Sequence, residues 1–275
     1  MTCGRKPTSW SISSTSETVS HNGDTPPVRR ILCTNDDGIH APGLELLESV
    51  ASVLGEPRVV APDREQSATS HSLTLHRPLR VTEVGPGRHV IDGTPTDCVL
   101  IAVKELLPWR PDFILSGVNH GPNMGEDVLY SGTVAAAMEG TILGIPSIAV
   151  SWAGGGREDL GAYATLLTEL LRGLIVRDDF PAETFFNINL PMRPVEEIEG
   201  IRVTTLGRRV YSDSLIRRED PGGREYFWIG GGVSSWSGGE NSDFRAVEAG
   251  FVSVTPLHLD LTNHRLLDEV TSWSL

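Results

Sequence analysis

Asp36 and Asp37 are adjacent carboxylates that follow a short apolar run and precede Gly38. If the chain turns here, both side chains converge on one position, and carboxylate oxygens are ligands that a hard divalent cation prefers. Asp and Gly are also common turn residues, so an ordinary turn explains the same pattern. The local sequence leaves both interpretations open, a metal-binding turn and a purely structural one.

Two further polar segments follow short apolar runs in the same way. Ser67 lies in a segment after the run 59–61, and Asn119 and Asn123 lie in a segment after the run 113–115. In an open parallel sheet, ligands usually bind beyond the carboxyl ends of the strands. We therefore expect the three polar segments to meet at one crevice.

Ser131, Gly132 and Thr133 open a predicted helix whose first residues are small. The amide groups at such an amino end can hold a phosphate, aided by the helix dipole. Many helices begin with a serine that only caps the backbone. A phosphate site and a simple cap are thus both compatible with these residues.

The elements that position these residues alternate along the chain. Helices are predicted at 42–54, 94–107, 131–139 and 160–176, and strands at 31–32, 59–61, 79–84, 89–91, 113–115, 147–150, 185–190, 201–206 and 251–257. Thr94 and Asp97 suit the cap of the second helix, which we favour over a chemical role. This alternation predicts an α/β fold with a mainly parallel sheet covered by helices.

Three regions differ in composition. Residues 1–28 are rich in Ser and Thr without an apolar period, which predicts a disordered tail. Residues 29–195 hold the alternating elements and are expected to form the catalytic core. Residues 196–275 are expected to form an extension with a projecting β-hairpin, whose aromatic residues contact a second subunit or cover the core.

Overall composition narrows the function classes. The chain has 275 residues, a formal net charge of −13 and three cysteines without paired spacing. This charge argues against binding a nucleic-acid polymer, and no apolar stretch is long enough to span a membrane. Unpaired cysteines favour a cytoplasmic location. The tail lacks a secretory signal; a weak likeness to a transit peptide and a misassigned start codon are equally compatible with it.

Several common catalytic motifs are absent from the sequence. It has no phosphate-binding P-loop and no dinucleotide glycine fingerprint, which gives little support to an ATPase or a nicotinamide dehydrogenase. It also has no His-Glu-x-x-His helix and no Gly-x-Ser-x-Gly elbow, which weakens a zinc peptidase or a serine esterase. The remaining candidate is an oxygen-rich crevice suited to a divalent ion and a phosphate.

A series of short motifs resembles, in order, those of the SurE-type 5′-nucleotidases, the family of the stationary-phase survival protein SurE. They lie at 34–43, 61–67, 93–98, 116–123, 130–133, 255–257 and 260–262. Together they extend from about Arg30 to about Thr262, and their order is more specific than any single motif. The amino-terminal tail departs from the usual start of the family.

The resemblance implies a Rossmann-like core with helices on both faces of the sheet and an oligomer-forming carboxyl extension. It implies a phosphatase that converts nucleoside 5′-monophosphates to nucleoside and phosphate, with 3′-nucleotides and polyphosphate as further candidate substrates. The carried-over metal ligands are Asp36, Asp37, Ser67 and Asn119, holding one divalent ion per subunit, Mg²⁺ or Mn²⁺. A homodimer or homotetramer is expected.

Further roles follow as hypotheses. Asn123 and the helix start at residues 131–133 would orient phosphate oxygens, and Asp36 or Asp37 would act as base or nucleophile. His40 and His120 lie nearby, but a structural or solvent-facing role is favoured for both. Two other functions fit the same crevice, a non-catalytic nucleotide sensor and a metal-dependent glycosyltransferase. Adjacent acids at the first strand fit the latter less well.

Overall fold

The structure is a computed structural model that describes residues 28–154, 160–177, 179–210, 215–229 and 235–273. The tail predicted to be disordered lies outside these ranges, except for Val28. Among the described residues, no helix is long and apolar enough to cross a membrane.

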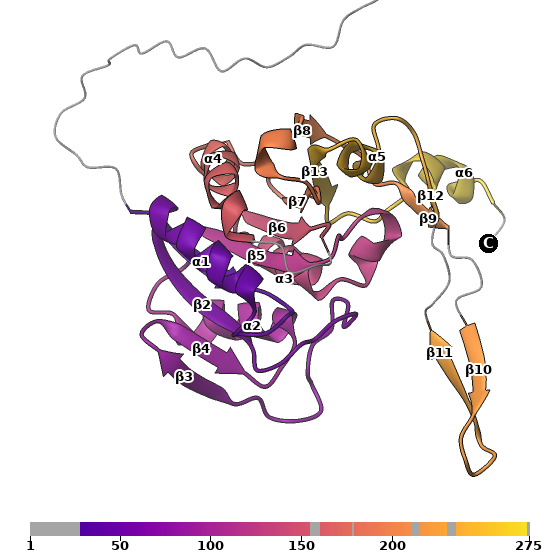
Figure 1. Cartoon of the computed structure of the whole chain (residues 1–275), viewed down its shortest axis with the longest axis horizontal. Coiled ribbons are helices and arrows are strands. Elements are labelled where there is room, and N and C mark those ends of the chain that lie inside the picture. The colour runs from indigo at the N-terminus through magenta and orange to yellow at the C-terminus, as the bar shows by residue number, and fades with distance from the viewer. Residues whose placement is uncertain (1–27, 155–159, 178, 211–214, 230–234, 274–275) are drawn as a thin grey trace, which may run out of the picture.

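The described strands form one large sheet and two small two-stranded ones. The large sheet has nine strands in the order β3 (Val81–Gly85), β4 (Arg88–Ile91), β2 (Glu56–Pro62), β1 (Arg30–Thr34), β5 (Phe113–His120), β6 (Ser147–Trp152), β7 (Thr184–Leu190), β13 (Phe251–His258) and β8 (Gly200–Val203). Within it, β3 is antiparallel to β4 and β13 to β7, while the other neighbours are parallel. The prediction of a mainly parallel sheet is confirmed (Figure 1).

Helices cover both faces of the sheet. Helices α1 (Pro42–Leu54) and α4 (Ala164–Ile175) pack on one face, and α2 (Pro95–Ile101) and α3 (Gly132–Ile142) pack on the other. Successive strand residues point to opposite faces. Accordingly Ile31 and Cys33 of β1 join the core under α1 and α4, while Leu32 joins the core under α2 and α3. The central strands β1, β2, β5 and β6 carry apolar runs because both of their faces are buried.

Local signals set the helix boundaries. Pro42 occupies the first position of α1, where its missing N–H leaves no bond unmade. Thr94 caps α2 in a capping box with Asp97, as predicted. The helix then continues as a π-helical turn, η1 (Ala102–Leu106), and four short 3₁₀ helices lie elsewhere in the described chain: η2 (Gly125–Leu129), η3 (Leu160–Tyr163), η4 (Val195–Glu197) and η5 (His264–Leu266).

The carboxyl-terminal part contributes β8 and β13 to the large sheet and also forms strands outside it. Strands β10 (Leu215–Glu219) and β11 (Glu225–Ile229) form an antiparallel hairpin that projects from the rest of the chain (Figure 1). Strand β9 (Arg208–Val210) pairs with β12 (Ser235–Ser237), and the carboxyl-terminal part also holds two short helices, α5 (Asp243–Glu248) and α6 (Leu267–Thr271). The projecting hairpin is confirmed.

Some boundaries differ from the prediction. Strand β5 continues to His120, through residues expected to form a loop, and its pairing with β6 shifts register between Ser116 and Asn119. Gly117, at a φ of +135°, supplies the backbone freedom that such an irregularity needs. The strand expected at 201–206 ends at Val203, and the predicted helix 160–176 begins with a 3₁₀ turn.

Candidate functional site

The three polar segments meet at one edge of the sheet. Strands β2, β1 and β5 are parallel neighbours, so their carboxyl ends lie side by side. The backbone N–H of Gln66, after β2, donates to the carbonyl of Asp36, after β1, at 2.7 Å. The backbone N–H of His120, at the end of β5, donates to Asp37 Oδ2 at 3.1 Å. The expected convergence is confirmed.

Asp36 is buried against the start of α3. Its side chain is 4% exposed, and its Oδ1 accepts a hydrogen bond from the hydroxyl of Thr133. A Cβ added to Gly132 would lie 2.8 Å from the Cβ of Asp36, so only glycine permits this close approach. Burial raises the pKa of Asp36 to about 6, opposed by hydrogen bonds from Thr133 and reinforced by the charge of Asp37.

Asp37 is half-buried, and its carboxylate is bonded to the end of β5. Burial raises its pKa, the hydrogen bond from the backbone of His120 lowers it, and the charge of Glu65 raises it. His120 lies edge-on to Trp152 with ring centroids 6.1 Å apart. His40 is exposed on the turn after Asp37. The two carboxylates are thus held by different elements, α3 and β5.

The other two candidate ligands are also fixed by local hydrogen bonds. The hydroxyl of Ser67 donates to Glu65 Oε1 at 2.6 Å. The side-chain amide nitrogen of Asn119 donates to the carbonyl of Gly121 at 2.8 Å, which commits the nitrogen and leaves the amide oxygen as the group that could bind a cation.

The loop that carries Ser67 is held in an unusual backbone conformation. Ala68 and Ser70 have φ angles of 57° and 55°, which residues other than glycine rarely adopt. The hydroxyl of Ser70 donates to the carbonyl of Leu129 at 2.7 Å, and His71 Nε2 lies 2.8 Å from Glu139 Oε2 on α3. These contacts attach the loop to η2 and to α3.

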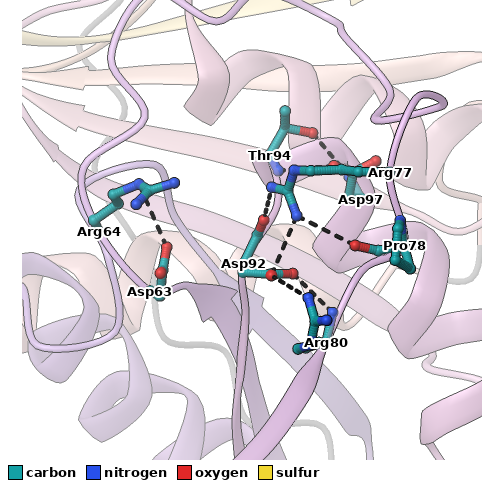
Figure 2. A network of polar contacts seen from close by, with 8 residues as sticks. All are labelled: Asp63, Arg64, Arg77, Pro78, Arg80, Asp92, Thr94 and Asp97. Carbon is teal, nitrogen blue, oxygen red and sulfur yellow. Dashed lines mark hydrogen bonds and ion pairs between the residues drawn. The ribbon is translucent and has the colours of Figure 1, made fainter.

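The far end of the same loop is attached to α2. Asp97 accepts from the backbone N–H groups of Thr74 and Thr94, at 2.9 and 2.8 Å. Figure 2 shows how Arg77 and Arg80 converge on Asp92 beside this cap. The backbone N–H of Arg80 and the Arg77 guanidinium lower the pKa of Asp92. The motif at residues 93–98 therefore secures the loop after β2.

The predicted phosphate-binding residues are all engaged within the protein. The side-chain amide of Asn123 donates to the hydroxyl of Ser151 at 2.8 Å, and its backbone is bonded by Asn187 and Asn189. Ser131 caps α3 by accepting from the N–H of Val134 at 3.1 Å. The structure brings the helix start to Asp36 and places Asn123 against β6 and β7, through Ser151, Asn187 and Asn189. Their roles toward phosphate stay predictions.

The donor set fits a hard divalent cation. Among the described residues, no lysine or arginine contributes to the pKa of Asp36 or Asp37, although one carboxylate is buried and the other half-buried. Buried charges in proteins are paired or coordinate a metal. Within those same ranges, no group of three or more His, Cys, Asp or Glu is placed to hold a metal ion. The candidate ligands comprise two carboxylates, a hydroxyl and an amide oxygen.

A family model described as "Survival protein SurE" matches residues 31–213. The chain belongs to the SurE family. A SurE relative from Gemmatimonas aurantiaca, named 5′-nucleotidase SurE, is 61% identical over 247 residues, which cover 89% of this chain and 98% of the relative. A second relative of that name, from Pelobacter propionicus, is 49% identical over 243 residues, covering 88% of this chain and 98% of the relative.

A solved structure supports the same membership. The crystal structure of the SurE protein from Aquifex aeolicus matches with a TM-score of 0.78 and 40% sequence identity, covering 88% of this chain and 98% of that chain. The resemblance read from the ordered motifs is confirmed, as is the α/β fold that it implied.

Three residues at this SurE site were not selected from the sequence. Glu65 accepts from Ser67, Glu139 contacts His71, and Trp152 forms a wall next to His120. Glu65 could have been found because it lies two residues before Ser67 in the same polar segment. Trp152 is the last residue of β6, and Asn119 is the second-last residue of β5. Trp152 could therefore have been found by inspecting the strand ends.

Proposed function

We propose that this chain is a divalent-metal-dependent phosphatase that hydrolyses nucleoside 5′-monophosphates to nucleoside and phosphate. The observation that carries this proposal is the placement of Asp36 and Asp37, buried and half-buried with no lysine or arginine among the described residues acting on their pKa, beside the segments that carry Ser67 and Asn119. The names of the relatives support the same activity.

One Mg²⁺ or Mn²⁺ per subunit is the ion that suits these ligands, because both prefer oxygen donors. Asp36, Asp37, Ser67 and Asn119 would hold it. When bound, such an ion neutralises phosphate charge and lowers the pKa of a water molecule.

The residues of the chain would then orient the two carboxylates and polarise the phosphate. Thr133 fixes the orientation of Asp36 through its hydroxyl, and the backbone of His120 fixes Asp37. The amino end of α3, capped by Ser131, lies next to Asp36, and its positive dipole end would, together with Asn123, orient the phosphate oxygens. In phosphoryl transfer most of the catalytic effect comes from positioning and charge stabilisation. Asp36 or Asp37 would in addition accept a proton from the attacking water, or attack phosphorus as the P–O bond to the nucleoside breaks and the nucleoside leaves.

The test measures phosphate release from AMP by the purified chain with Mn²⁺ or Mg²⁺, with and without a chelator. Asp36→Ala should abolish release while the circular dichroism spectrum stays unchanged. Asp63→Ala is the matched control, since Asp63 also follows a strand, β2, and its Oδ1 lies 3.8 Å from Nε of Arg64. Full activity in Asp36→Ala, or nucleotide binding without release in the wild type, as in a sensor, would exclude the proposal.

We further propose that residues 196–275 form an extension that assembles a homodimer or homotetramer. Phe227 and Trp228 on the hairpin are 58% and 63% exposed, and an isolated hairpin buries little apolar surface by itself. Light scattering on Phe227→Glu should show a smaller particle than the wild type. Val53→Glu, at an equally exposed position of α1, is the control that should not change it.

A further inference from the structure

Asp243 is a buried carboxylate at the first position of α5, in the carboxyl-terminal part of the chain. Its side chain is 0% exposed. Its Oδ1 accepts hydrogen bonds from the backbone N–H groups of Gly207 and Phe244, at 2.9 and 2.8 Å, and its Oδ2 accepts from the backbone N–H of Gly125 at 2.8 Å. One carboxylate therefore joins three segments: α5, the residue before β9, and the start of η2.

The backbone of η2 packs closely against this carboxyl-terminal segment. A Cβ added to Gly125 would lie 2.9 Å from the carbonyl oxygen of Gly207 and 3.1 Å from Cζ3 of Trp236. A Cβ added to Gly207 would lie 2.5 Å from the ring of Phe244. The bond from Gly125 to Asp243 thus depends on two glycines that let the two backbones approach each other.

The next two residues of η2 are bonded to β9. The backbone N–H of Arg209 donates to Glu126 Oε2 at 2.6 Å, and the Arg209 guanidinium forms a hydrogen-bonded ion pair with Asp127. The same guanidinium lies over the ring of Trp236 on β12, 5.6 Å from its centroid. Hydrogen bonds to charged groups are roughly twice as strong as neutral ones. The first three residues of η2 are therefore all bonded to the carboxyl-terminal part.

On its other side, η2 lies between two predicted phosphate-binding positions. It begins two residues after Asn123 and ends two residues before Ser131, the cap of α3. The carbonyl of Asp127 accepts from the backbone N–H of Ser131 at 3.1 Å, and the backbone N–H of Asn123 donates to Asn189 Oδ1 at 2.8 Å. The position of η2 therefore sets where the start of α3 lies relative to Asn123.

We propose that Asp243 and Arg209 are positioning residues for the phosphate end of the site, because they hold η2 and thereby hold Asn123 and Ser131 in the arrangement that binds phosphate oxygens. This inference rests on the proposed function and deepens it: the carboxyl-terminal part contributes to substrate binding in addition to assembly. Asp243 acts through the backbone of Gly125, and Arg209 acts through the carboxylates of η2.

Asp243→Asn is nearly isosteric and breaks one of the three bonds. Its single side-chain oxygen stays with the two N–H groups that Oδ1 serves, since the opposite orientation would lose two bonds instead of one. Its NH₂ group then faces the N–H of Gly125 and cannot accept it. Ser242→Ala is the matched control, because Ser242 is the adjacent residue, is 1% exposed, and donates its hydroxyl to the carbonyl of Gly239 at 2.7 Å within its own turn.

The experiment measures KM for AMP and the inhibition constant of inorganic phosphate, using the full-length chain with Mn²⁺. Asp243→Asn should raise both by at least about threefold, because the same groups hold phosphate in substrate and product. The Mn²⁺ concentration for half-maximal release should change less, since the candidate metal ligands are held by other bonds. Ser242→Ala should keep all three values near those of the wild type. A purely structural bond would lower the free energy of unfolding in urea without raising KM.

Amide hydrogen exchange gives a readout that does not depend on catalysis. In Asp243→Asn, peptides that cover residues 123–134 should exchange faster than in the wild type, because η2 loses a bond that holds it closed. Peptides from α1 should exchange at the wild-type rate. Ser242→Ala should show the wild-type rate in both regions.

Arg209 gives an independent variant, which decides the question if Asp243→Asn does not fold. Arg209→Ala removes the ion pair with Asp127 while the backbone bond to Glu126 stays, so KM for AMP should rise in the same direction. Arg209→Lys keeps the charge and should restore most of the wild-type KM. Arg245→Ala is the control, because its Nη1 lies 3.3 Å from Glu248 Oε2 in an exposed pair on α5, and exposed pairs contribute little.

The outcomes separate this inference from the proposed function. Wild-type KM values and phosphate inhibition constants in both Asp243→Asn and Arg209→Ala would overturn the positioning role and leave the proposed activity in place. Faster exchange in η2 with an unchanged KM would overturn it as well, because η2 would then have no influence on phosphate. A wild type that releases no phosphate from nucleoside monophosphates would overturn both.

Discussion

Nε2 of His71 lies 2.8 Å from Oε2 of Glu139, and this contact connects the loop that carries Ser67 to the helix that carries Thr133. Glu139 is 6% exposed, so removal of His71 leaves a buried carboxylate without this bond, at a cost of about 1–3 kcal/mol. The pair thus holds two parts of the candidate site in register with each other.

We expect Glu139→Ala to raise the metal concentration that gives half-maximal phosphate release, because the Ser67 loop loses its attachment to α3. Glu139→Gln keeps an acceptor for His71 and should behave nearly as the wild type. Glu183→Ala removes the partner of an exposed histidine, His258, whose Nε2 lies 3.8 Å from Glu183, and serves as control. Identical metal titrations for Glu139→Ala and Glu183→Ala would contradict a positioning role.

Thr133→Val should lower kcat/KM by about 10- to 100-fold, the usual effect of losing a hydrogen bond that orients a metal ligand. Valine has nearly the same shape, so α3 should stay folded. Thr141→Val is the control on the same helix, since Thr141 is also buried but its hydroxyl donates to the carbonyl of Ala137 at 3.0 Å. Steady-state kinetics and urea unfolding on both variants separate a catalytic loss from a loss of stability.

Much of the fold could be predicted from local pattern. The apolar runs that became β1, β2 and β6 are short and bounded, and the cap at Thr94 with Pro95 marks α2 directly. The extent of β5 was not predictable, because Ser116, Gly117 and Asn119 have the composition of a loop and are kept in the sheet by pairing with β6. Tertiary pairing outweighs local preference there.

The order of the later strands in the sheet could also not be predicted from the sequence. Strand β13 lies between β7 and β8, antiparallel to one and parallel to the other, through contacts between distant residues. At the candidate site, Asp36 and Asn119 were selected by their positions at or after strand ends. The bond from Thr133 to Asp36 spans 97 residues, and no local pattern encodes such a contact. Residue type and order can suggest a site, but partners that fix its geometry come from the fold.

Gly43→Ala should destabilise the protein by about 1–3 kcal/mol, the usual cost of forcing an extra group into a packed interior. An added Cβ at this position of α1 would lie 1.9 Å from the carbonyl oxygen of Val118. Gly173→Ala is the matched control, because Gly173 is an exposed residue of α4 with no neighbour within 4 Å of an added Cβ. That variant should gain about 0.5–1 kcal/mol from helix propensity. The free energies of unfolding in urea should therefore shift in opposite directions.

The thiol of Cys33 makes the free energy of unfolding depend on pH in the alkaline range. Burial raises the pKa of its thiol to about 12, against a smaller lowering by the charge of Arg88. An exposed thiol in the unfolded chain titrates near about pH 8.5. Between these values the unfolded state loses a proton that the folded state retains, so the free energy of unfolding falls as pH rises, by up to about 1.4 kcal/mol per pH unit for this thiol. Below about pH 8 the thiol is protonated in both states, so it does not change the free energy of unfolding with pH.

Cys33→Ala removes this titration, so its unfolding free energy should decline less steeply than that of the wild type between about pH 9 and about pH 11, whatever the other groups contribute. Urea unfolding at a series of pH values measures the two slopes. Alkylation followed by peptide mass spectrometry provides an independent check, since Cys33 and the equally buried Cys98 should react only after urea is added. Parallel slopes in the two proteins, or labelling of Cys33 in the folded state, would contradict the burial that raises the pKa.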